Sequence, residues 1–162
     1  MGSVAGPSGE IRTGGDDVLT AKDMVAAKGG QVYNVEQDAT VFEAAKLLSE
    51  KRVGAVVVTS GPRVIGIFTE RDLVNRVVAA GLDPSQTPVG EVMTSPVVCC
   101  QPQTTKAECV KVMTERRIRH LPIADHEELV GMISIGDILA QEVADQQSTI
   151  QYLHEYMFSQ PR

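Results

Sequence analysis

The hydrophobic and polar positions of this chain predict short strands alternating with helices. An unbroken apolar run at 53–58 predicts a strand buried on both faces. Apolar positions at helical spacing from 40 to 50, with Thr40 three residues before Glu43, predict a helix that begins with a capping box. The same criteria predict, along the chain, a short helix at 21–24, a strand at 32–35, a helix at 40–50, strands at 53–58 and 63–68, a helix at 69–80, a short helix at 89–93, a strand at 96–100, a helix at 105–116, strands at 118–123 and 128–133, and a helix from 134.

This order of elements occurs twice, at an offset of 65 residues. The segment Gly66–Asp72 (Gly-Ile-Phe-Thr-Glu-Arg-Asp) corresponds to Gly131–Asp137 (Gly-Met-Ile-Ser-Ile-Gly-Asp). A repeat of this length without gaps predicts two halves of one body, packed about a pseudo-twofold axis. We place the first repeat at 18–83 and the second at 84–145.

The two ends of the chain lie outside the repeat. Residues 1–17 are rich in glycine and have no hydrophobic period, so they are expected to form a disordered leader. The helical pattern continues after 145, which predicts an amphipathic helix and tail at 146–162. Its apolar positions are Ile150, Leu153, Tyr156 and Met157. Such a helix is expected to pack either on its own body or on a partner subunit.

Composition narrows the class of protein. With 162 residues, 43% hydrophobic and 4% aromatic, the chain fits one ordinary domain or two small units with an aliphatic core. A net charge of −6 without a basic block argues against nucleic acid as the main partner, and no apolar run is long enough to span a bilayer. No secretory signal is evident, and three cysteines make no disulfide framework. We expect a cytoplasmic location, or an organelle matrix if a longer precursor exists.

The repeated Gly-x-x-(Ser/Thr)-x-x-Asp motif suits a ligand. Glycine lets the backbone approach a ligand closely, and the hydroxyl of Thr69 or Ser134 can cap a helix or bind a phosphate. A carboxylate one turn into the helix, Asp72 or Asp137, accepts two hydrogen bonds at once, which suits the hydroxyls of a ribose. The alternative is that the hydroxyls are only caps and that each Asp, at an exposed first turn, contributes at most about 1 kcal/mol to folding. The occurrence of the motif in both halves favours the ligand.

The repeated order of elements, together with this motif, resembles the cystathionine-β-synthase (CBS) domain, two of which in tandem form a Bateman module. The resemblance covers roughly 18–145, and the C-terminal segment resembles that of small stand-alone CBS-pair proteins. It implies an α/β fold of two CBS repeats and a regulatory module that binds an adenosine ligand such as AMP, ADP, ATP or NAD. Family members often stack as disc-shaped dimers through the helices after each motif. We therefore expect a homodimer and a regulated protein partner.

The resemblance also implies two nucleotide clefts, each with a motif from one repeat and a strand largely from the other. The first cleft would comprise Asp137, Ser134, Tyr33, Val53, Gly54 and Ala55. The second cleft would comprise Asp72, Thr69, Val98, Ile118, Arg119 and His120. Arg71, Arg119 and His120 are candidates for binding phosphate. Because Gly54 and Ala55 replace Arg119 and His120 in the first repeat, the two clefts are expected to differ in occupancy.

Other chemistries have less support in the sequence. No His or carboxylate stands at metal-ligand spacing from His120, so no metal site is predicted. Cys99, Cys100 and Cys109 are expected to be packing residues, with a regulatory thiol as the alternative. No catalytic motif is found, so no enzyme is predicted. The rival interpretations are a ligand-free interaction or scaffold module, a thiol-linked regulator of a redox partner and, last, a fragment of an enzyme.

Overall fold

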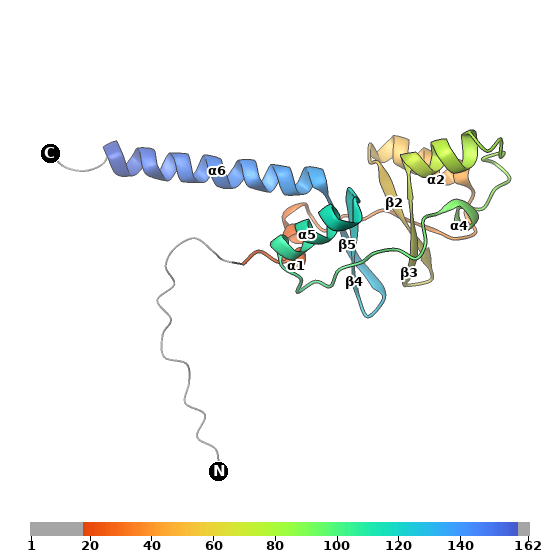
Figure 1. The fold of residues 1–162 in the computed structure, drawn as a ribbon, viewed down its shortest axis with the longest axis horizontal. Coiled ribbons are helices and arrows are strands. Elements are labelled where there is room, and N and C mark those ends of the chain that lie inside the picture. The colour runs from red at the N-terminus through yellow and green to blue at the C-terminus, as the bar shows by residue number, and fades with distance from the viewer. Residues whose placement is uncertain (1–17, 159–162) are drawn as a thin grey trace, which may run out of the picture.

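The computed structural model describes residues 18–158, with side chains described to Glu155. The predicted leader at 1–17 and the side chains of Tyr156 and Met157 lie outside the described residues. The elements are α1 Ala21–Ala27, β1 Asn34–Glu36, α2 Val41–Lys51, β2 Ala55–Ser60, β3 Arg63–Thr69, α3 Glu70–Asp72, a π-helical segment η1 Leu73–Val78, α4 Val89–Val92, α5 Lys106–Arg116, β4 His120–Asp125, β5 Glu128–Ser134 and α6 Ile135–Phe158 (Figure 1).

The predicted α/β fold of two repeats is confirmed. Helix α2 and strands β2 and β3 recur as α5, β4 and β5 with bounds shifted by the same 65 residues. Thr40 and Thr105 both cap their helices through the predicted capping boxes with Glu43 and Glu108. The strands form one five-stranded sheet in the order β1-β2-β3-β5-β4. Each half contributes an antiparallel hairpin, and the two hairpins meet where Arg63 pairs with Glu128.

The strand predicted at 96–100 is reduced to one bridging residue, Cys100, which pairs in parallel with Ile123. In the first repeat, Val57 N donates to Tyr33 O at 3.0 Å and β1 pairs with β2 as a strand. The equivalent donor in the second repeat is Pro122, which has no N–H to offer. Loss of that hydrogen bond explains why the equivalent segment does not extend its pairing.

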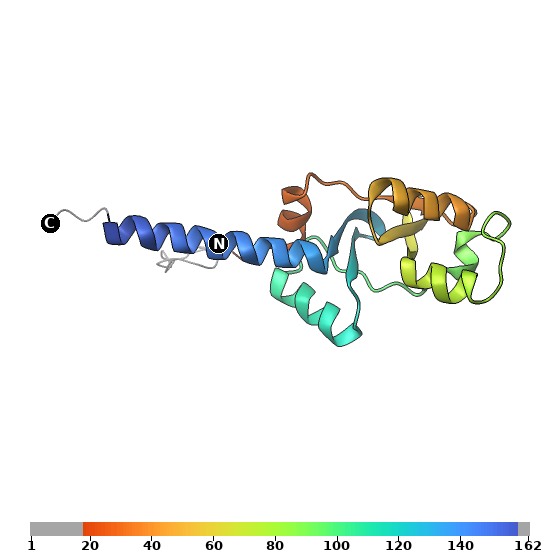
Figure 2. The same cartoon turned by 90° about the horizontal axis from the view of Figure 1, so that it is seen from above.

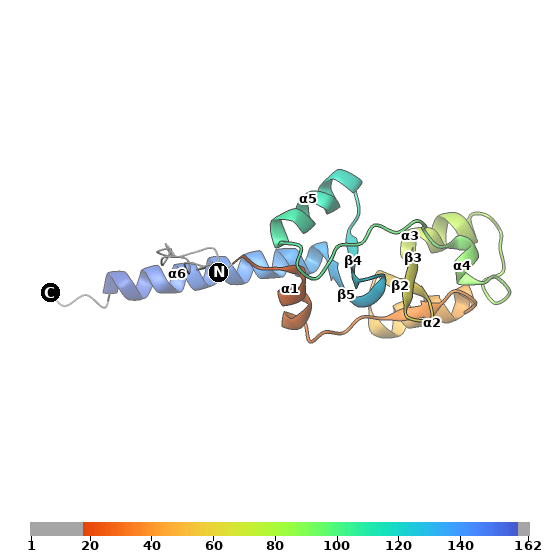
Figure 3. The same ribbon diagram turned by 90° about the horizontal axis from the view of Figure 1, so that it is seen from below.

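The two short helices exchange places between the repeats. Helix α1 begins the first repeat, but its residues Ala21, Met24 and Val25 are buried in a core with α5, β4 and β5 of the second. Helix α4 begins the second repeat, and its Val89 and Val92 are buried in the core of the first. Figures 2 and 3 show α1 at the same end of the body as α5, and α4 at the opposite end beside α2. Each core is therefore completed by a helix from the other repeat.

The helices after the two motifs differ from each other. A regular helix was expected at 69–80, but three residues of α3 are followed by the π-helical segment η1. After the second motif, α6 runs without interruption from Ile135 to Phe158 and projects from the body (Figure 1). Ile138 is buried against the second core, whereas every residue from Glu142 to Glu155 is exposed. No helix within residues 18–158 is long and apolar enough to cross a membrane.

Candidate functional site

The glycines of the two motifs serve packing between elements. A Cβ on Gly131 would lie 2.5 Å from Val25 Cγ1, and one on Gly66 would lie 2.4 Å from Met93 Sδ. Distances this short are repulsive, so a side chain at 131 would push α1 away from β5, and one at 66 would force Met93 to move and would crowd Thr94 O at 3.0 Å. Close approach of these glycines to a ligand stays a prediction, and packing is the role that the structure gives them. They permit the exchange of the short helices.

Asp72 of the first motif is buried and fully engaged by the protein. Its residue exposure is 5%, and its Oδ2 accepts hydrogen bonds from Thr69 N at 3.0 Å and Thr69 Oγ1 at 3.2 Å. Its Oδ1 accepts from Thr94 Oγ1 at 3.0 Å and lies 3.5 Å from Arg76 Nε. The expectation that this Asp lies at an exposed first turn is wrong. In this conformation the carboxylate holds the start of α3 and the segment after α4.

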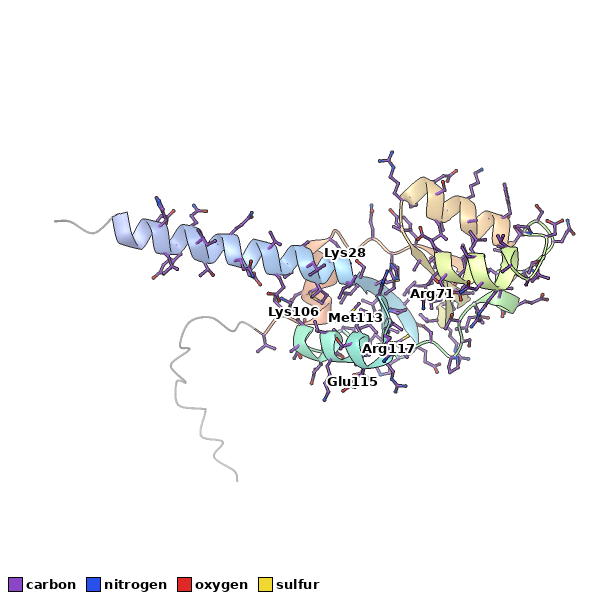
Figure 4. The ribbon with its side chains drawn as sticks, turned by 45° about the horizontal axis from the view of Figure 1, so that its top comes forward. Lys28, Arg71, Lys106, Met113, Glu115 and Arg117 are labelled. Atoms are coloured by element: carbon purple, nitrogen blue, oxygen red, sulfur yellow. The ribbon has the colours of Figure 1, made fainter. Side chains whose placement is uncertain are left out.

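Asp137 of the second motif is half-buried and reachable from solvent. Its side chain is 28% exposed, and its Oδ2 accepts hydrogen bonds from Ser134 N and from Lys28 Nζ, both at 2.8 Å. Burial raises the pKa of Asp137, but the hydrogen bonds from Lys28 and Ser134 outweigh it, so the pKa lies below its ordinary value. Asp137 is therefore an ionised carboxylate at the start of α6 that is partly accessible to solvent. Figure 4 shows Lys28 at the base of that helix.

His120 lies between the two motifs. It is paired with Ser134 in the hairpin of β4 and β5, and a Cβ on Gly54 would lie 3.4 Å from its Cε1 and 3.5 Å from its Nε2. Such a Cβ would also lie 3.8 Å from the carboxylate of Glu70, the residue after Thr69. The structure thus brings together predicted residues from both clefts. Gly54 leaves the space that the imidazole occupies.

The surroundings of His120 are charged. Burial lowers the pKa of His120, and Lys28 and Arg119 lower it further, while Glu70 and Asp137 partly oppose the shift. The net shift is downward, so the neutral imidazole is favoured near pH 7. A neutral His offers one donor and one acceptor to a ligand. Carboxylates and cations from both repeats therefore surround a half-buried imidazole.

The other predicted site residues are distributed over both repeats. Ala55 is buried and pairs with Thr69 in the first hairpin, as His120 pairs with Ser134 in the second. Val98 and Ile118 pack against the core of the second repeat, and Tyr33 and Val53 against that of the first. Arg71 and Arg119 are exposed. Figure 4 shows Arg71 to the right of Lys28, farther from the base of α6.

Sequence analysis missed three residues at these positions. Lys28 reaches Asp137 from 109 positions away, and Thr94 reaches Asp72 from 22 positions away. Both contacts arise from the exchange of the short helices, which no local motif signals. Glu70 lies inside the first motif, at a position where the motif allows any residue. The motif therefore gives no chemical reason to select it.

Thiol and metal chemistry have little support in the geometry. Burial raises the pKa of all three thiols, that of Cys109 to about 12, so the reactive thiolate is disfavoured near pH 7. Cys99 is exposed and Cys109 is buried. Within the described part of the chain, no group of three or more His, Cys, Asp or Glu side chains could hold a metal ion.

The chain belongs to the CBS domain family, because the family's model matches residues 22–79 and 89–143. It is therefore a tandem CBS-domain protein, as the repeated motif predicts. The two matches fall on the two structural repeats and include both motifs.

Comparison with individual proteins gives the same family. The chain is 32% identical over 152 residues to the Arabidopsis thaliana CBS domain-containing protein CBSX3, mitochondrial, with 88% of this chain and 74% of the relative covered. A putative signal-transduction protein with CBS domains from Burkholderia ambifaria has a solved structure similar to this fold, at TM-score 0.73 and 39% identity over 79% of this chain and 96% of that one. The Pyrobaculum aerophilum CBS domain protein PAE2072, complexed with AMP, matches at TM-score 0.66 and 27% identity over 74% of this chain and 89% of that one.

Proposed function

We propose that this protein is a regulatory module that binds an adenine nucleotide or dinucleotide at Asp137. The observation that carries the proposal is the state of the two motif aspartates. The side chain of Asp137 is ionised and 28% exposed, whereas that of Asp72 is 7% exposed and bonded on both oxygens to its own chain. Support also comes from the AMP complex of the Pyrobaculum aerophilum relative.

The groups around Asp137 match the parts of a nucleotide. The carboxylate would accept hydrogen bonds from the ribose hydroxyls. The hydroxyl of Ser134 and the N-terminus of α6 would favour a phosphate, and Lys28 and Arg119 would supply positive charge. His120 would offer its neutral imidazole. By the family resemblance, the half-buried Tyr33 and Val53 would contact the base, with Gly54 and Ala55 beside them.

Ligand binding would change a contact that already exists. A ribose on Asp137 would compete with Lys28 Nζ, which also donates to Met132 O at 3.1 Å. Lys28 follows α1, and α1 is part of the second core, so displacement of Lys28 would act on the link between the repeats. This is the differential interaction that a regulatory ligand needs in order to shift a conformational equilibrium. The second cleft, at Thr69 and Asp72, would bind only after its internal hydrogen bonds are released.

The proposed output is a contact with a protein partner, made by a homodimer. Val74 and Val78 after the first motif are 57% and 65% exposed, and their 65-residue equivalents Leu139 and Val143 are 59% and 53% exposed. Exposed apolar rows of this kind favour association. We place the protein in the cytoplasm or an organelle matrix, in line with the mitochondrial name of the Arabidopsis relative.

A thermal-shift panel of AMP, ADP, ATP, NAD, adenosine and inorganic phosphate tests the proposal. A ligand at one hundred times its dissociation constant adds about 2.7 kcal/mol, a rise of about 5–10 °C in Tm for this chain length. Asp137→Asn should weaken binding about tenfold or more, because it removes a charged acceptor. Asp145→Asn makes the same charge change on the exposed part of α6 and should bind like the wild type. If no adenosine compound shifts Tm at millimolar concentration, the chain is a ligand-free scaffold and the proposal fails.

A further inference from the structure

Helix α6 carries an apolar row that its own body leaves uncovered. Leu139, Val143, Ile150 and Leu153 are 59%, 53%, 66% and 50% exposed. The helix projects from the body (Figure 1), and the exposed row runs from position 139 to position 153 along it. Apolar side chains repeated along one face of a solvated helix indicate a contact surface for another helix.

The spacing of the row identifies the kind of surface. Leu139, Val143, Gln146, Ile150 and Leu153 are separated by four, three, four and three residues, and the sequence continues the spacing at Met157. Alternating steps of three and four make a period of 3.5, which is the heptad of a left-handed coiled coil. A helix packed on a flat protein surface would follow 3.6. The row therefore has the spacing of a coiled-coil seam, in which Leu139, Gln146 and Leu153 would occupy d and Val143 and Ile150 would occupy a.

The residue types select the partner and the direction. β-Branched residues at a with leucine at d favour a parallel coiled coil of two helices. Gln146 is polar at a core position, and one such residue fixes register because it is satisfied only by its counterpart. We propose that α6 of this protein forms a parallel two-stranded coiled coil with α6 of a second copy, along the seam from Leu139 to Leu153.

Charge does not oppose this pairing. The positions that flank the seam are Ala140, Glu142, Gln147, Thr149, His154 and Tyr156. Glu142 is their one acidic residue, and it is bonded to Lys106 of its own chain, which also lies 3.9 Å from Asp145. Figure 4 shows Lys106 at the base of α6. The Glu142 carboxylate is thus paired with a cation of its own chain.

The coiled coil goes beyond the homodimer proposed above, because it assigns the residues and orients the two copies. The seam begins at Leu139 and Val143, the repeat equivalents of Val74 and Val78, and continues along the part of α6 that projects from the body. Parallel helices place the two bodies head to head, with both C-termini at the same end. A head-to-tail dimer would send the two α6 helices in opposite directions.

Sedimentation equilibrium of the full chain tests the seam, with each change paired with a control off the seam. Ile150→Asn should weaken the dimer at least tenfold, while Ser148→Asn should leave it unchanged. Gln146→Leu should tighten the dimer at least fivefold, because it adds an apolar contact at d, whereas Gln151→Leu should not. If Ile150→Asn and Ser148→Asn give the same dissociation constant, the coiled coil is overturned.

Two further experiments test the parallel direction of the two α6 helices and the contact through Val74. In a Cys99→Ser background, which removes the exposed thiol, Leu153→Cys should form a disulfide-linked dimer in a glutathione redox buffer. A parallel seam brings the two 153 positions together, and an antiparallel one keeps them apart, so absence of the disulfide would overturn the parallel direction. If Val74→Asp dissociates the dimer and Ile150→Asn does not, the dimer forms through the surface at Val74, and the coiled coil is refuted. A wild type that stays monomeric at micromolar concentration would refute both.

Discussion

Replacement of the two motif aspartates should separate a structural carboxylate from a ligand carboxylate. Asp72→Ala removes the acceptor for Thr69 N at 3.0 Å and for Thr94 Oγ1 at 3.0 Å, at a residue that is 5% exposed. Water has little access to the gap, so the helix start loses a partner without replacement. Asp137→Ala removes an acceptor that is 28% exposed, where water can solvate Ser134 N and Lys28.

The magnitudes follow from these environments. A hydrogen bond to a charged group contributes about 1.5–3 kcal/mol and a helix cap about 1 kcal/mol, so Asp72→Ala should lower the free energy of unfolding by about 2–4 kcal/mol. For a chain of this length that is a fall in Tm of about 5–15 °C. Asp137→Ala loses a solvated cap and a half-exposed ion pair, about 1 kcal/mol in all. Asp137→Ala should instead abolish most of the response to a nucleotide.

Urea denaturation followed by far-UV circular dichroism measures the difference, since the chain has no tryptophan. Both variants and the wild type are compared without ligand and at one protein concentration, because dimerisation shifts apparent stability. Equal losses of stability for the two variants would refute the distinction between the sites. A stable Asp72→Ala variant that loses nucleotide binding would show that the ligand binds at Asp72, against our proposal.

Two further predictions concern packing and protonation. Gly131→Ala should lower the free energy of unfolding by about 1–3 kcal/mol, because its Cβ would overlap a side chain of α1. Gly136→Ala, in α6 and without such an overlap, should raise the free energy of unfolding by about 0.5–1 kcal/mol. Thermal denaturation of both variants measures the two changes. The pKa of His120 is lowered in the folded protein, so between pH 7 and 5 the unfolded state binds more protons and stability should fall as pH falls through about 6.5. His120→Gln should flatten this slope in urea denaturation; the same slope in His120→Gln and in the wild type would contradict the assignment.

The sequence predicts the fold of this chain well because the signals are local and occur twice. The capping boxes at Thr40 and Thr105 and the buried run at 53–58 each lie within one element. One exception is the strand at 96–100, whose pairing lacks a backbone donor because Pro122, twenty-odd positions away, has no N–H. The π-helical turns of η1 also differ from the expected helix, and no residue in that segment explains them.

The site was predicted less completely because its electrostatics come from tertiary contacts. The motif locates Asp72 and Asp137 and gives them the same role, yet burial separates them. That difference arises from Thr94 and Lys28, which the exchanged short helices bring in. The motif glycines were assigned to a ligand because a pattern does not show what lies above a strand.

The exchange of α1 and α4 makes the two repeats mechanically inseparable. Neither repeat possesses its own complete interior, because Ala21, Met24 and Val25 fill the second core and Val89 and Val92 fill the first. Detachment of α1 would expose the core of the second repeat, and detachment of α4 would expose the core of the first. We therefore expect loosening to spread from one half to the other and the pair to melt as a single cooperative unit.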